Sequence, residues 1–120
     1  MKIFVFGSNL AGRHGKGAAL DAKTLWDAEY GVGEGPTGRA YAIPTKDESL
    51  KRRTILQIRA SVNKFKEYAK AHPEMVFFVT RIGCGLAGYK DDDIGPMFEG
   101  APSNCELPPG WGQPVKPDYY

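Results

Sequence analysis

Two glycine-rich segments hold the residues of this 120-residue chain that could do chemistry. The first, residues 7–17, contains four glycines with a serine, an asparagine, an arginine, a histidine and a lysine. The second, residues 83–89, contains three glycines and a cysteine. Glycine lets a ligand approach the backbone, and successive N–H groups in such a loop can bind an anion. A tight turn that needs glycine would explain either segment alone, but the two together predict a site for a phosphate-like anion.

Predicted strands and helices alternate around these segments. Apolar runs at residues 2–6, 39–45 and 75–79 predict buried strands. Apolar residues at helical spacing predict a helix over residues 15–29 and a longer one that ends at His72 before a proline. Ligands of open α/β sheets lie outside the carboxyl ends of the strands, so we predict an α/β fold with the anion site at that edge.

Smaller features complete the predicted domain. The longer helix has one apolar stripe, made of Ile55, Ile58, Val62, Phe65 and Ala69. Residues 31–38 are predicted as a turn-rich connection, residues 91–98 as a short helix capped by aspartates, and residues 104–107 as an edge strand. We expect a single domain over residues 1–111, followed by a flexible polar tail at residues 112–120.

Composition narrows the classes of partner. The net charge of +2 does not by itself indicate nucleic acid or a membrane, and no segment is apolar enough to span one. The chain enters a strand without a signal peptide, and two cysteines make no disulfide framework, so we expect a cytoplasmic protein. No cluster has metal-ligand spacing, and we expect neither a metal nor a cofactor.

A basic helix face over residues 50–70 offers a different function. It carries Lys51, Arg52, Arg53, Arg59, Lys64, Lys66 and Lys70. Such a face could bind nucleic acid. We favour a solvated face, because no aromatic residues are interleaved with the cations and acids elsewhere nearly balance the charge.

Single reactive side chains are ambiguous. His14 could act as an acid–base group or phosphate donor, or simply be an exposed loop histidine. Cys84 has no evident base and is better explained as a small buried residue than as a nucleophile. Arg13, Lys16 and Arg81 could supply positive charge to a diphosphate.

Three motifs in order resemble the macro domain family, which binds ADP-ribose. They are Val5–Asn9 with Gly15–Ala19, then Tyr41–Lys46, then Arg81–Tyr89. The last motif and the Thr45-Lys46 pair are most similar to the terminal ADP-ribose glycohydrolase branch. The resemblance covers roughly residues 3 to 107, and the chain also resembles small macro-like proteins of phages and bacteria.

The resemblance implies a three-layer α/β/α sandwich with a mostly parallel sheet, and a ligand whose diphosphate lies between the two glycine loops. It implies ADP-ribose, a related nucleotide diphosphate or an ADP-ribosylated macromolecule as the partner. The implied ligand-binding residues are Gly7, Ser8, Asn9, His14, Gly15, Gly17, Thr45, Ile82, Gly83, Cys84, Gly85, Leu86, Ala87, Gly88 and Tyr89. Ser8, Asn9 and Tyr89 would approach the distal ribose.

Departures from the family leave the activity open. Lys46 occupies the position of the glycohydrolase lysine, but Ala87 occupies that of its aspartate, and Asp91 is the nearest candidate replacement. Lys16 stands where another hydrolase branch places an acid. The acidic residue that recognises adenine in the family has no counterpart before residue 2. The chain therefore resembles a hydrolase, either an ADP-ribosyl glycohydrolase or an ADP-ribose phosphate phosphatase, or else an inactive reader. Such a reader could sequester a nucleotide, for example as a phage protein that counteracts a defence of the host.

Overall fold

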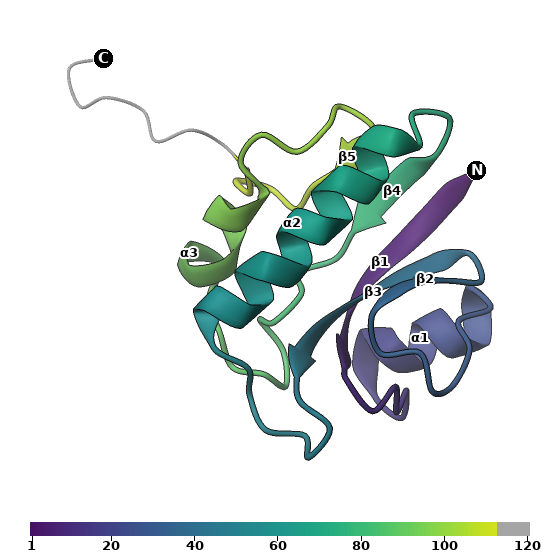
Figure 1. Ribbon diagram of the computed structural model, residues 1–120, viewed down its shortest axis with the longest axis vertical. Coiled ribbons are helices and arrows are strands. Elements are labelled where there is room, and N and C mark those ends of the chain that lie inside the picture. The colour runs from purple at the N-terminus through teal and green to yellow at the C-terminus, as the bar shows by residue number, and fades with distance from the viewer. Residues whose placement is uncertain (113–120) are drawn as a thin grey trace.

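A five-stranded sheet forms the centre of the protein in a computed structural model that describes residues 1–112 (Figure 1). The elements are β1 (Lys2–Asn9), α1 (Gly17–Leu25), β2 (Gly35–Thr37), β3 (Ala40–Lys46), α2 (Ile55–Ala71), β4 (Val76–Val79), α3 (Asp91–Ile94), the 3-10 helix η1 (Gly95–Phe98) and β5 (Cys105–Glu106). The strand order is β2-β3-β1-β4-β5. Only β2 is antiparallel to its neighbour, so the sheet is mostly parallel as predicted.

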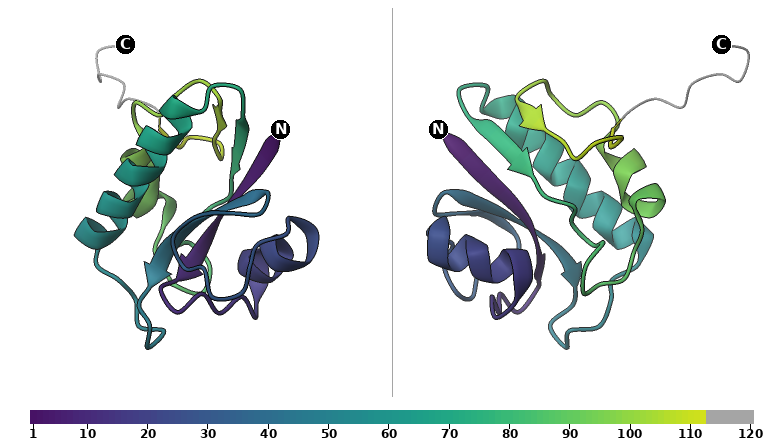
Figure 2. Two further views of the ribbon diagram at one scale, coloured as in Figure 1. Left: turned by 45° about the vertical axis from the view of Figure 1, so that its right-hand side comes forward. Right: turned by 180° about the vertical axis from the view of Figure 1, so that it is seen from behind.

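Helices cover both faces of this sheet. The views in Figure 2 show α1 on one face and α2 with α3 on the other. Each face has its own buried cluster: Phe4 and Phe6 pack with alanines of α1 and β3, whereas Val5 and Ile43 pack toward α2. The predicted three-layer α/β/α sandwich is confirmed.

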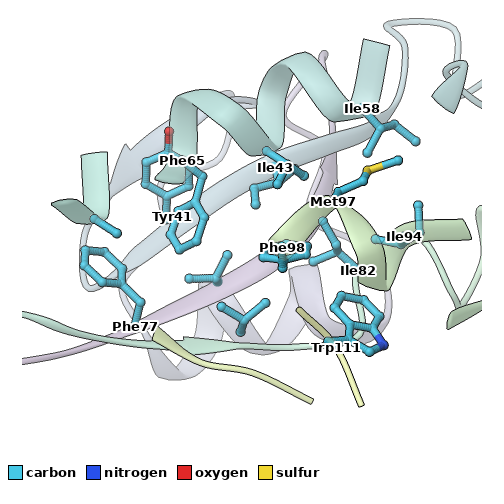
Figure 3. Close-up of a cluster of buried hydrophobic side chains, with 14 of the residues drawn as sticks. Tyr41, Ile43, Ile58, Phe65, Phe77, Ile82, Ile94, Met97, Phe98 and Trp111 are labelled. Atoms are coloured by element: carbon cyan, nitrogen blue, oxygen red, sulfur yellow. The ribbon is translucent and has the colours of Figure 1, made fainter. Parts of the chain in front are cut away.

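The predicted apolar stripe of α2 contributes Ile58, Val62, Phe65 and Ala69 to the larger cluster (Figure 3). Phe65 is fully buried, and its ring centroid lies 5.0 Å from that of Tyr41 and 5.4 Å from that of Phe77. Thr54 and Gln57 begin the helix with a reciprocal capping box. The helix is therefore fixed at its start by local hydrogen bonds and along its length by burial.

Several predicted boundaries were wrong near the first glycine-rich segment. Residues 7–9 belong to β1 rather than to a loop, because they continue the pairing with β3. The first helix runs from Gly17 to Leu25, not over residues 15–29. Residues 35–37 form β2 rather than part of a turn, and they pair with the beginning of β3.

The end of the predicted domain is held by backbone contact. The N–H of Gly112 donates to the carbonyl of Gly95 at 3.1 Å. Gly112 was predicted to begin the flexible tail; the rest of that predicted tail, residues 113–120, lies outside the described residues. None of the helices within residues 1–112 is long and apolar enough to cross a membrane.

Candidate functional site

The loops that follow β1, β3 and β4 gather at one edge of the sheet, where the parallel strands end (Figure 1). A cavity of about 570 Å³ lies among them. Twelve of the predicted site residues line it: Gly7, Ser8, Asn9, Gly15, Gly17, Thr45, Lys46, Ile82, Gly83, Gly85, Leu86 and Ala87. Two stretches supply most of the lining, and we call residues 9–19 the first wall and residues 80–89 the second wall.

The charged side chains that line the cavity are all cationic. They are Arg13, Lys16, Lys46 and Arg81, and no aspartate or glutamate is among the described lining residues. Cations gathered in a concave site raise the local concentration of anions. Among these four, Lys46 was predicted as a catalytic residue and the other three as sources of positive charge.

Backbone N–H groups on the first wall are free. Helix α1 begins at Gly17, and the first N–H groups of a helix have no carbonyl to bond within the helix. Those of Gly17, Ala18 and Ala19 have no acceptor among the described residues, and all three residues line the cavity. The helix dipole adds partial positive charge at the same place.

The second wall presents a similar set. A turn closes when the N–H of Gly88 donates to Gly85 at 3.0 Å and that of Tyr89 donates to Gly83 at 2.8 Å. Within the described chain, the N–H groups of Gly85, Leu86 and Ala87 are left without an acceptor, and these residues also line the cavity. On each wall, three consecutive lining residues thus have N–H groups without an acceptor among the described residues.

Neutral polar side chains in the lining are already engaged. The hydroxyl of Ser8 donates to the carbonyl of Gly33, and that of Thr80 donates to Val5 at 2.7 Å. The amide of Asn9 bonds both the N–H and the carbonyl of Arg13, at 3.0 and 2.8 Å. Ser8 and Asn9 line the cavity, and their approach to a ribose stays a prediction; the amide of Asn9 also closes the first wall.

The first wall lies on residues 31–33, which we predicted only as a turn. Gly31 donates to the carbonyl of Gly12 at 2.8 Å. Nε2 of His14 lies 3.2 Å from the carbonyl of Val32, and the imidazole meets Phe6 edge-on at 5.3 Å between ring centroids. His14 is only 1 % exposed, burial lowers its pKa, and it does not line the cavity. The sequence offered no signal for this buried position.

The second wall is tied to the segment before α2. The hydroxyl of Tyr89 donates to the carbonyl of Arg53, and the guanidinium of Arg52 lies 4.2 Å from the centroid of the Tyr89 ring. Tyr89 and the neighbouring Gly88 are not among the lining residues. In this arrangement Tyr89 holds the loop, and its contact with a ribose stays a prediction.

Asp91 also lies outside the cavity lining. Its carboxylate accepts two bonds from Arg81, at 2.9 and 2.8 Å, and one from the indole of Trp111 at 2.9 Å. These donors lower the pKa of Asp91, Arg81 first. Cys84 lies 3.8 Å from the same carboxylate; burial and that charge raise the pKa of its thiol, which opposes a nucleophilic role. The structure does not bring Asp91 into the cavity with Lys46.

Three of the cations on and before α2 make contacts within the protein. Arg53 donates to the carbonyl of Pro44 at 2.8 Å and to the hydroxyl of Ser61 at 2.9 Å. The amine of Lys66 donates to the carbonyls of Met97 and Glu99. With Arg52 stacked on a tyrosine, the basic face has fewer cations available for a nucleic acid than its sequence suggests.

Comparison with known proteins adds a fold relationship. No protein-family model and no curated protein matches the chain. A solved structure, described as that of a protein of unknown function from Bacteroides thetaiotaomicron, superposes with a TM-score of 0.59. The match covers 81% of this chain and 77% of that one at 20% sequence identity. At this identity the similarity establishes a shared fold alone.

Proposed function

We propose that this protein binds ADP-ribose or a related nucleotide diphosphate in the cavity at the carboxyl ends of the strands. One observation carries the proposal: three residues with unbonded N–H groups on each wall, and four cationic side chains, line the same space. A diphosphate has two groups of acceptor oxygens, and each wall offers donors to one group. Charge-assisted bonds from backbone N–H groups are among the stronger hydrogen bonds in proteins. The resemblance to macro domains supports the same ligand class.

Within this proposal, the protein is a reader or sequestering protein rather than a hydrolase. Removal of an ADP-ribosyl group needs a base or a partner that takes a proton from the attacking group. The described lining offers the amine of Lys46 but no carboxylate, and Asp91 is bonded to Arg81 and Trp111. We further infer a cytoplasmic protein, since Cys84 and Cys105 are both free thiols.

Calorimetric titration with ADP-ribose tests binding, with AMP as the control ligand. AMP carries one phosphate and can satisfy one wall only, so we expect it to bind at least about tenfold more weakly. Lys16→Ala should lower the affinity for ADP-ribose about tenfold, because it removes a cation from the cavity. Lys64→Ala, an exposed cation of α2, is the matched control and should change nothing. Equal binding of AMP and ADP-ribose would contradict the proposal.

Turnover of an ADP-ribosylated protein tests the reader against the hydrolase. We expect no release of ADP-ribose by the wild-type protein under conditions where it binds the free ligand. Release that Lys46→Ala abolishes would show that the lysine does catalyse the reaction, and the hydrolase would then replace the reader.

A further inference from the structure

Two exposed leucines line the cavity beside its cations. Leu50 is 45 % exposed and Leu86 is 71 % exposed. They belong to different segments, the loop after β3 and the second wall. In a cavity, apolar side chains beside charged groups suit a ligand that has both an anionic and an apolar part.

The loop after β3 is built to hold Leu50 in an unfavourable conformation. Leu50 has a φ of 64°, a region that residues with a branched side chain rarely occupy. Asp47 keeps the turn closed: its carboxylate accepts the N–H groups of Ser49 at 2.8 Å and Lys51 at 2.9 Å. Strain that persists in a well-bonded turn beside a cavity is a common property of ligand contacts.

The cavity offers little with which to read the edge of a base. A base is distinguished by donors and acceptors that match its polar edge. The side chains of Ser8, Asn9 and Thr80 are bonded to the backbone, and the hydroxyl of Thr45 is directed at the carbonyl of Ser8 at 3.4 Å. What remains is positive charge, free N–H groups and apolar surface.

We propose that the cavity selects for the diphosphate, while Leu50 and Leu86 pack on the flat face of the attached base without reading its edge. This inference rests on the proposed function and names its ligand class: nucleoside diphosphate compounds of purines and pyrimidines alike. Every nucleobase has an apolar face, so packing of this kind tolerates any of the four bases.

Titrations with ADP, GDP, CDP and UDP test the proposal, because these ligands carry the same charge and differ only in the base. We expect their dissociation constants to agree within about threefold. If ADP-ribose binds but ADP is favoured over UDP by about tenfold or more, the proposed function stands and this inference is overturned. If neither ADP-ribose nor any of the series binds, the proposed function fails and the inference fails with it.

Two variants test the leucines. Leu86→Ser, and Leu50→Asn, which suits the positive φ, should each weaken ADP binding about fivefold and leave the affinity for inorganic pyrophosphate unchanged. Leu56→Ser is the matched control, since Leu56 is an equally accessible leucine on α2, 75 % exposed. An equal loss for ADP and pyrophosphate, or no loss for ADP, would overturn the role of the leucines.

Discussion

The two walls of the cavity present similar backbone donors but are held in place differently. The first wall is stabilised by backbone and by its own residues: Asn9 closes it, and residues 31–33 lie beneath it. The second wall is held by its own side chains, which bond to other segments: Tyr89 donates to the carbonyl of Arg53, and Arg81 donates to Asp91. Both walls reach the core, through Ala19 of the first and Ile82 of the second. They therefore differ in what fixes their loops rather than in burial. We therefore expect substitutions in the first wall to lower mainly the stability of the protein, and substitutions in the second wall to change mainly its affinity for the ligand.

The largest effect is expected from Gly12→Ala in the first wall. A Cβ atom at Gly12 would lie 2.2 Å from the carbonyl carbon of Gly31, and its φ of 70° is unfavourable for alanine. Backbone cannot yield as a side chain can, so we expect a loss of about 3 kcal/mol or more in the free energy of unfolding, measured by urea titration. Gly15→Ala, where a Cβ meets nothing within 4 Å, should unfold like the wild type. Equal midpoints for both variants would contradict this view of the first wall.

A pH dependence of stability should arise from His14, the buried histidine of the same wall. Its pKa is lowered from 6.5 by burial, so the unfolded chain takes up a proton at a higher pH than the folded protein. The contribution of His14 is therefore complete above pH 6.5 and declines as the pH falls below it, with a slope of at most about 1.4 kcal/mol per pH unit.

Urea titrations at pH 7, 6 and 5 measure that slope. His14→Phe should reduce it, whereas His72→Phe, which changes the other histidine, should retain it. A slope that His14→Phe leaves intact would show that the buried imidazole is not its source.

Tyr89→Phe should loosen the second wall at moderate cost. The variant keeps the ring over Arg52 and loses the hydrogen bond to the carbonyl of Arg53. We expect a loss of about 1 kcal/mol in unfolding free energy and a severalfold weaker binding of ADP-ribose. Tyr30→Phe, at an exposed tyrosine, should change neither quantity. Unchanged ADP-ribose affinity in Tyr89→Phe would show that this contact does not support the site.

The smallest expected effect tests whether Asp91 belongs to the binding site or lies only beside it. Asp91→Asn removes a negative charge next to Arg81, so we expect ADP-ribose to bind about two- to threefold more tightly and the urea midpoint to fall. Asp92→Asn removes an exposed carboxylate beside it and serves as the control. Calorimetry that shows a tenfold loss of affinity would contradict the placement of Asp91 outside the binding site.

The sequence predicted the parts of this molecule that depend on local pattern. The stripe from Ile55 to Ala69 predicted the buried face of α2, on which all of its members but Ile55 are buried. Both glycine-rich segments proved to line one cavity. β2 was missed because Gly35 and Pro36 are typical of turns; its pairing with β3 is a tertiary contact. Such contacts override local preference.

Some predicted site residues do not line the cavity, because their side chains contact residues outside the local sequence pattern. The ring of His14 packs against Phe6 and Tyr30, which lie outside its own loop. Asp91 accepts a hydrogen bond from Trp111, which is twenty residues later in the sequence. No spacing rule links these residues. Leu50 was missed because a positive φ at a leucine is visible only in the folded chain.

Amide chemical shifts during an ADP-ribose titration test the central claim most directly. If one diphosphate is held by both walls, the N–H groups of residues 17–19 and residues 85–87 should shift together, at the same ligand concentration, and more than any others. Shifts confined to one wall, or centred on the basic face of α2, would contradict the account.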